Sequence, residues 1–152
     1  MEARLLCSGT EKTYVLIFDT GDEVMQILEE FARRNGLGGS HFTAIGAFQD
    51  ATLGYFEWDR KKYKPIPIHE QVEVVSLIGD IALDQKGAPK VHAHVVLGKS
   101  DGTAWGGHLL EAHVRPTLEL TLIESPGHLQ RKYDPAAGIA LINLDVSEGV
   151  PA

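Results

Sequence analysis

Three histidines stand at spacings that suit a metal site: His92, His94 and His108. The residues around the first two are β-branched and apolar, which favours a strand. Side chains on a strand alternate between its two faces, so His92 and His94 share a face. Three neutral imidazoles that converge on one point can hold zinc or a similar divalent ion and leave a fourth position open. The spacing therefore predicts a divalent metal, most simply zinc, as the cofactor.

His108 can join the other two histidines in only one strand register. Residues 100–102 read Ser-Asp-Gly, which favours a turn, and the strand that follows this turn carries His108. If His94 lies opposite His108, a loop of residues 99–103 remains between the strands, which fits a turn with a glycine bulge. A two-residue turn would pair His94 with Leu109 and point His108 away. The metal hypothesis therefore commits the hairpin to the first register.

A catalytic use of this metal would need an acid or base beside it. A zinc-bound water can reach a pKa of about 7, and a hydrolytic enzyme would move its proton through a nearby side chain. The candidates for this acid or base are Glu73, Glu111 and His113, in a second layer of residues around the metal ligands. Strand alternation turns Glu111 and His113 away from His108 unless a bulge intervenes. This weakens the case for an enzyme and leaves catalytic residues unassigned.

Composition and charge limit the other function classes. The chain has 152 residues and a formal net charge of −7, from 21 acidic and 14 basic residues, which argues against tight non-specific binding of nucleic acid. No apolar run approaches the ~18 residues of a membrane span, and the N-terminal residues do not predict a signal peptide. The single cysteine, Cys7, excludes an internal disulfide and fits the cytoplasm. We expect one domain over residues 1–145 and a loose C-terminal tail over residues 146–152.

The periodicity predicts an α+β fold. Thr20 to Glu23 match a capping box, and apolar residues recur at helical spacing from Val24 to Phe31. The rest of the chain favours about eight strands with mostly short connections, which suits a mostly antiparallel or mixed sheet with one main helix packed on it.

Two features leave the strand boundaries open. We expect strands at residues 41–48 and 51–58 with a turn at Gln49 and Asp50 between them. Arg115-Pro116 either divides the strand after the hairpin or kinks a continuous one. Both positions bear on how the hairpin joins the remainder of the sheet.

The histidine hairpin, together with the strand before it, resembles the plants-and-prokaryotes-conserved (PPC) domain. The resemblance implies an α+β fold, a homotrimer, and a metal near the histidines that align with His92, His94 and His108. In plants this domain follows AT-hook motifs in nuclear DNA-binding proteins, whereas prokaryotic members stand alone. The matching residues are Glu73-Val74-Val75-Ser76-Leu77-Ile78-Gly79, His92-Ala93-His94-Val95, Leu97-Gly98, Asp101-Gly102 and Gly106-Gly107-His108-Leu109.

The chain also departs from the plant pattern. It has no Arg-Gly-Arg-Pro AT-hook for the minor groove, and residues 70–75 lack the glycine and arginine with which the plant domain reaches its protein partners. We favour a metal-containing, trimeric regulatory or DNA-associated module over an enzyme, although the net charge supports neither a DNA nor a protein partner. The alternatives are a zinc-dependent metalloenzyme acting on a small molecule, and histidines that pack in a trimer core without a functional metal.

Overall fold

Long strands dominate the computed structural model, which describes residues 1–8 and 10–147. Most of the predicted tail, residues 148–152, lies outside the described residues. The elements are β1 (Glu2–Ser8), β2 (Lys12–Asp19), α1 (Val24–Asn35), β3 (Gly39–Glu57), β4 (Lys62–Ile68), β5 (Val72–Leu83), β6 (Pro89–Gly98), β7 (Ala104–Glu124), β8 (Arg131–Asp134) and β9 (Ile139–Ile142), with short 3₁₀ turns at Trp58–Arg60 and Leu144–Val146. Among the described residues, no helix has the length and hydropathy to cross a bilayer.

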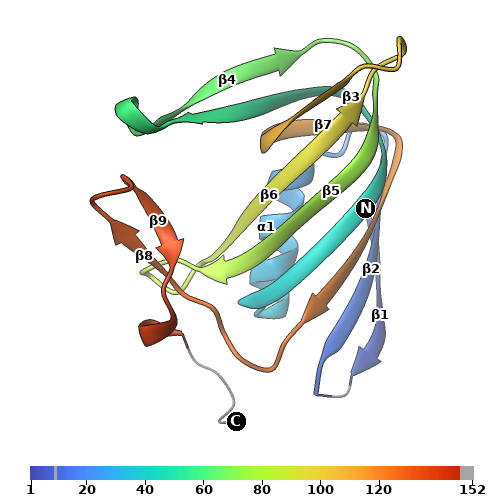
Figure 1. Ribbon diagram of the computed structural model, residues 1–152. Helices are drawn as coiled ribbons and strands as arrows, with labels where there is room; N and C mark the ends of the chain where they lie inside the picture. Colours follow the sequence, from blue (N-terminus) through green and yellow to red (C-terminus); the bar gives the residue numbers. More distant parts are fainter. Residues whose placement is uncertain (9, 148–152) are drawn as a thin grey trace.

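The main sheet is antiparallel and coils back on itself. Its order is β1-β2-β7-β6-β5-β3-β4, and β7 also pairs with β3, while β8 and β9 form a separate two-stranded sheet (Figure 1). The extra pairing is possible because β3 and β7 are long enough to run through two parts of the sheet. The predicted α+β fold, mostly antiparallel with one main helix, is confirmed.

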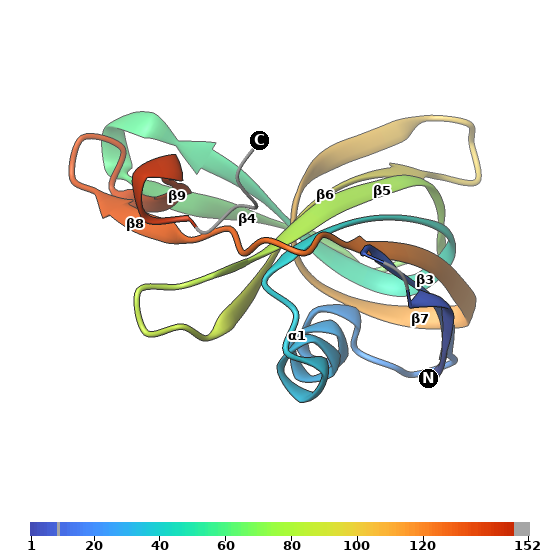
Figure 2. The same ribbon diagram turned by 90° about the horizontal axis from the view of Figure 1, so that it is seen from below.

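The helix α1 covers one face of this sheet (Figures 1 and 2). Its buried face is formed by Val24, Leu28 and Ala32. The predicted capping box is wrong, because the side chain of Glu23 itself accepts hydrogen bonds from the backbone N–H groups of the first turn. The hydroxyl of Thr20 instead donates to the carbonyl of Pro116, which ties the start of the helix to β7.

The predicted turn at Gln49 and Asp50 is also wrong, because β3 runs through it without a break. The strand instead bends against β7, and its pairing with β7 changes register on both sides of Phe48. β7 likewise continues through Pro116, so the kinked alternative holds there. At Gly46, which has a φ of 151°, an added Cβ would lie 2.3 Å from the carbonyl oxygen of Thr117. The bend therefore brings the two backbones together where only glycine fits.

Candidate metal centre

The hairpin of β6 and β7 has the register that the metal hypothesis requires. His94 pairs with His108, and Gly98 pairs with Ala104, which leaves the loop of residues 99–103. Gly102 in this loop has a φ of 83° and donates its N–H to the carbonyl of Lys99. The five-residue loop thus fixes the pairing that turns His108 toward His94.

The three histidines gather at one point on the sheet. Each offers a ring nitrogen, and the three nitrogens lie within 4.8 Å of one another. Nε2 of His92 and Nε2 of His94 are 3.2 Å apart. Tetrahedral zinc, with Zn–N distances of about 2.0–2.1 Å, places its nitrogen ligands roughly 3.3 Å apart. The spacing of this pair fits two ligands of one such ion.

His108 is the most buried part of the cluster. Its Nδ1 is inaccessible to solvent and has no hydrogen-bond partner among the described residues, and its ring stacks on Tyr63 with 4.4 Å between the centroids. Burial, followed by the neighbouring charges of His92, His94 and Arg131, lowers the pKa of His108 to about 4. Burial also lowers the pKa of His94. Both rings are therefore held in the neutral form that binds a metal.

Asp80 supports the cluster from β5. It pairs across the sheet with His92, and its Oδ2 lies 3.3 Å from Nδ1 of that ring. Burial alone would raise the pKa of Asp80, but hydrogen bonds and charge from His92 and Arg131 outweigh it and lower the pKa. An ionised Asp80 favours a proton on Nδ1 of His92 and leaves the lone pair of Nε2 for a ligand bond.

Together these observations fit a divalent ion. Three ring nitrogens converge, Nδ1 of His108 is buried with no hydrogen-bond partner in the part of the chain that the structure describes, and a carboxylate orients the ring of His92. An unpaired buried polar atom costs about 1–3 kcal/mol, which a bound cation would offset in part. His92, His94 and His108 are the residues that would hold the ion, and they leave one tetrahedral position for another ligand.

The residues predicted as an acid or base beside the metal, Glu73, Glu111 and His113, lie apart from the contacts of the histidine cluster. Nδ1 of His113 is 2.8 Å from Asp50, and that contact raises the pKa of His113. A bulge opposite Thr52 does interrupt the alternation of β7 before Glu111. The negative charge of Glu111 contributes to raising the pKa of His113. Glu73 pairs with Gly98, at the far end of β6 from His92.

Sequence reasoning missed three residues beside the cluster: Asp80, Tyr63 and Arg131. A signal for Asp80 was present, because the turn at residues 84–88 pairs Leu83 with Pro89 and so places Asp80 opposite His92. Tyr63 comes from β4, and Arg131 comes from β8. Neither has a local spacing that would connect it to the histidines.

The fold and this cluster define a small antiparallel α+β domain with a three-histidine candidate metal site. The sequence model of the Plants and Prokaryotes Conserved (PCC) domain family matches residues 6–126 of this chain. The chain therefore belongs to this family, as the resemblance predicted.

Solved structures of similar proteins agree with this assignment. A plant- and prokaryote-conserved protein from Pyrococcus horikoshii is 36% identical, with a TM-score of 0.81 over 86% of this chain and 90% of that one. A protein from Archaeoglobus fulgidus described as metal-containing is 30% identical, with a TM-score of 0.80 over 94% and 99% of the two chains. A Ralstonia eutropha protein with a provisional DNA-binding name is 32% identical, with a TM-score of 0.80 over 86% and 90%.

Two curated relatives contain a matching region within a longer chain. They are described as Bifunctional protein GlmU and come from two strains of Synechococcus, with 29% and 30% identity over 96% and 94% of this chain. The chain spans 23% and 22% of their length. The likeness therefore concerns one region of those proteins.

Proposed function

We propose that this chain is a zinc-containing PPC-domain protein that assembles as a homotrimer and serves as a regulatory module in the cytoplasm. The observation that carries the metal half is that ring nitrogens of His92, His94 and His108 lie within 4.8 Å of one another. Nδ1 of His108 is also buried, with no hydrogen-bond partner among the described residues. The description of the Archaeoglobus fulgidus relative as metal-containing supports it. Zinc is the ion of choice because three imidazoles and one open position suit its tetrahedral coordination.

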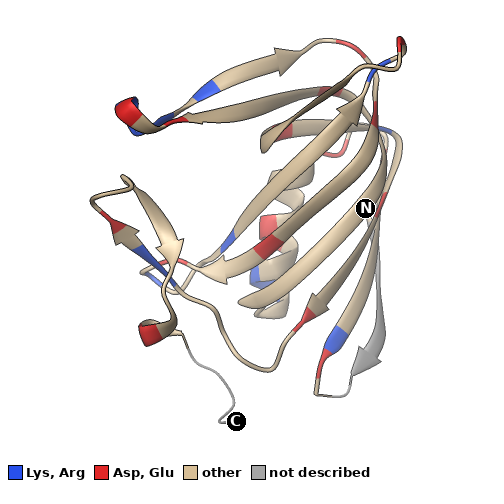
Figure 3. Cartoon of the chain, viewed as in Figure 1, with Lys and Arg blue, Asp and Glu red and all other residues tan. Residues whose placement is uncertain are grey.

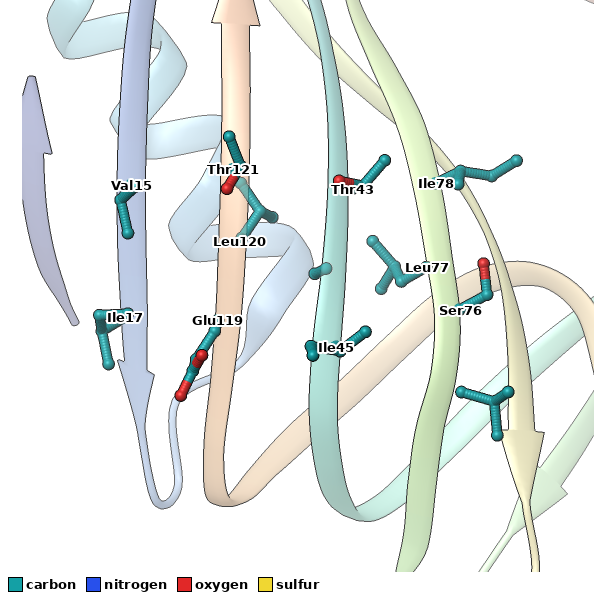
Figure 4. Close-up of a pocket in the computed structure, with 12 residues that line it drawn as sticks. Val15, Ile17, Thr43, Ile45, Ser76, Leu77, Ile78, Glu119, Leu120 and Thr121 are labelled. Atoms are coloured by element: carbon teal, nitrogen blue, oxygen red, sulfur yellow. The ribbon is translucent and has the colours of Figure 1, made fainter. Parts of the chain in front are cut away.

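An exposed apolar face supports the trimer. The face of the main sheet opposite α1 carries Ile45, Val75 and Ile78, which are 62%, 60% and 54% exposed. These side chains border a hollow of about 410 Å³ (Figure 4). Apolar surface of this kind on a sheet usually marks a protein interface. We assign it to further copies of this chain, as the family resemblance implies.

The DNA-associated role that the family resemblance suggested has less support. Lys and Arg are scattered over the described residues and do not gather on one face in the view of Figure 3. The net charge of −7 would oppose the approach of a phosphate backbone. We therefore expect regulation to proceed through contacts with other proteins rather than through direct contact with DNA.

A metalloenzyme is the second candidate, and one observation favours it. A pocket of about 360 Å³ is lined by His92 and His94 together with the apolar side chains of Phe42 and Ile78. A small molecule in this pocket would lie beside the metal ligands. The carboxylate nearest to them, Asp80, is engaged by Arg131 and His92, so it is a poor general base.

The metal content of tag-free protein tests the main proposal. We expect about one zinc per chain in the wild type and its loss in His94→Ala and His108→Ala. The control is His69→Ala, because His69 is an exposed residue between β4 and β5. Absence of zinc from folded wild-type protein after exposure to zinc salts would refute the metal site.

Light scattering tests the trimer. The wild type should have three times the mass of one chain, and Ile45→Lys should shift it toward the monomer because three lysines would be buried in an apolar interface. The matched control is Lys62→Ala on the edge strand β4, where the side chain is exposed. A monomeric wild type at micromolar concentration would contradict the trimer.

A further inference from the structure

Arg131 reaches the metal centre from a segment outside the matched family region, which ends at residue 126. Backbone bonds hold the approach to β8 against the end of β5. The N–H of Leu83 donates to the carbonyl of Leu129 over 2.8 Å, and the N–H of Leu129 donates to the carbonyl of Gly38 over 2.8 Å. A parallel bridge also joins Leu83 to Gln130. These bonds place the next residue, Arg131, at the same end of β5 that carries Asp80.

The side chain of Arg131 is 11% exposed and ends on Asp80. It contacts Oδ1 of Asp80, while Oδ2 of the same carboxylate lies 3.3 Å from Nδ1 of His92. One carboxylate oxygen of Asp80 thus contacts the permanently charged guanidinium of Arg131, and the other faces the ring of the candidate metal ligand His92. A carboxylate anchored in this way has little freedom to turn away from His92.

This division of contacts gives Arg131 a role that reaches the metal through two intermediates. Asp80 can orient His92 only while its own position is fixed, and the contact from β8 that fixes it is the one made by Arg131. Arg131 also supplies the positive charge that offsets a half-buried carboxylate. Metal-ligand histidines depend on such supporting groups, whose loss typically lowers metal affinity by about 10–100-fold.

Resting on the proposed metal-binding function, we propose that Arg131 is a positioning residue of the metal centre, acting through Asp80 on His92. The segment from Leu129 to Asp134 is therefore part of the site, and it couples the docking of the β8–β9 sheet to metal affinity. Linkage makes this coupling reciprocal, so a bound metal also holds β8 more firmly on β5.

Zinc affinity, measured by competition with a chromogenic chelator, gives the first test. We expect Arg131→Gln to weaken zinc binding by about tenfold, Asp80→Asn by about 10–100-fold, and Arg131→Lys to recover part of the loss. The matched control is Lys132→Ala, since Lys132 is the next residue of β8 and its side chain is exposed. Equal affinity in the wild type and Arg131→Gln would overturn the proposal.

The tautomer of His92 gives a second test that needs no metal. Long-range ¹H–¹⁵N spectra of metal-free protein should show the Nδ1–H form of His92 in the wild type and a mixture of tautomers in Arg131→Gln. A role limited to anchoring β8 would leave this spectrum unchanged, and that result would overturn the proposal. If the wild type takes up no zinc, the proposed function fails. The His92 spectrum still decides whether Arg131 orients His92 through Asp80.

Discussion

Replacing His108 with glutamine should make the metal-free protein less sensitive to acid. His108 has a pKa of about 4 in the folded protein, against an ordinary value of 6.5, because burial disfavours its charged form. Between these two values the unfolded chain binds a proton that the folded chain does not. The stability that comes from the neutral ring is therefore fully present above about pH 6.5 and is lost as the pH falls toward 4.

The size of the effect follows from the shift in pKa. Lowering the pKa of His108 from 6.5 to about 4 corresponds to at most about 3–4 kcal/mol, at about 1.36 kcal/mol per pKa unit. His108 is only half-buried, so screening by water reduces the expected change to about 2 kcal/mol. In the wild type, this much of the free energy of unfolding should disappear between about pH 7 and about pH 4 on account of His108 alone.

Urea unfolding with a chelator present, at fixed protein concentration, measures this change. The loss of stability on acidification should be about 2 kcal/mol smaller in His108→Gln than in the wild type. His69→Gln, which removes an exposed histidine, should behave like the wild type. If His108→Gln and the wild type lose equal stability, the neutral, buried state of His108 is not the source of the pH dependence.

Three further substitutions test other contacts. Asp50→Asn should lower the pKa of His113, which is raised by the hydrogen bond that the ring donates to the Asp50 carboxylate, and NMR titration would check it. In the wild type this pair stabilises the fold below the ordinary histidine pKa and loses that effect as the pH rises through the raised value. Gly46→Ala should cost about 2 kcal/mol in urea unfolding because its Cβ would meet the backbone of β7, whereas Gly87→Ala, with a φ of 78° and open space, should cost about 1 kcal/mol. Glu124→Gln should cost about 2 kcal/mol, since this buried carboxylate accepts two backbone N–H groups and a hydroxyl, and an unchanged midpoint would contradict that role.

The sequence was most informative where contacts are local. His92, His94 and His108 lie on one hairpin, so strand alternation and the length of a single loop were enough to predict their meeting. The register of β5 with β6 is equally local, because the turn at residues 84–88 joins the two strands and so places Asp80 opposite His92.

The remaining features depend on contacts between distant segments. Gln49 and Asp50 have the composition of a turn, yet β3 continues because β7 and β4 pair with it on either side. Tertiary pairing overrides local preference at such positions. Arg131 approaches Asp80 only because its backbone docks on β5, and no periodicity in the sequence encodes that docking.

The locality of the histidine hairpin also has a consequence for folding kinetics. Because all three candidate ligands lie between residues 92 and 108, closing the hairpin costs little chain entropy and takes microseconds. We expect zinc to bind this hairpin before the long-range pairing of β3 with β7 is complete, and so to act as an early nucleus. The unfolded chain would then retain some affinity for the ion, so zinc would stabilise the native state by less than its native affinity implies. The difference between the two affinities would measure what Asp80 and Arg131, which arrive later from β5 and β8, add to the site.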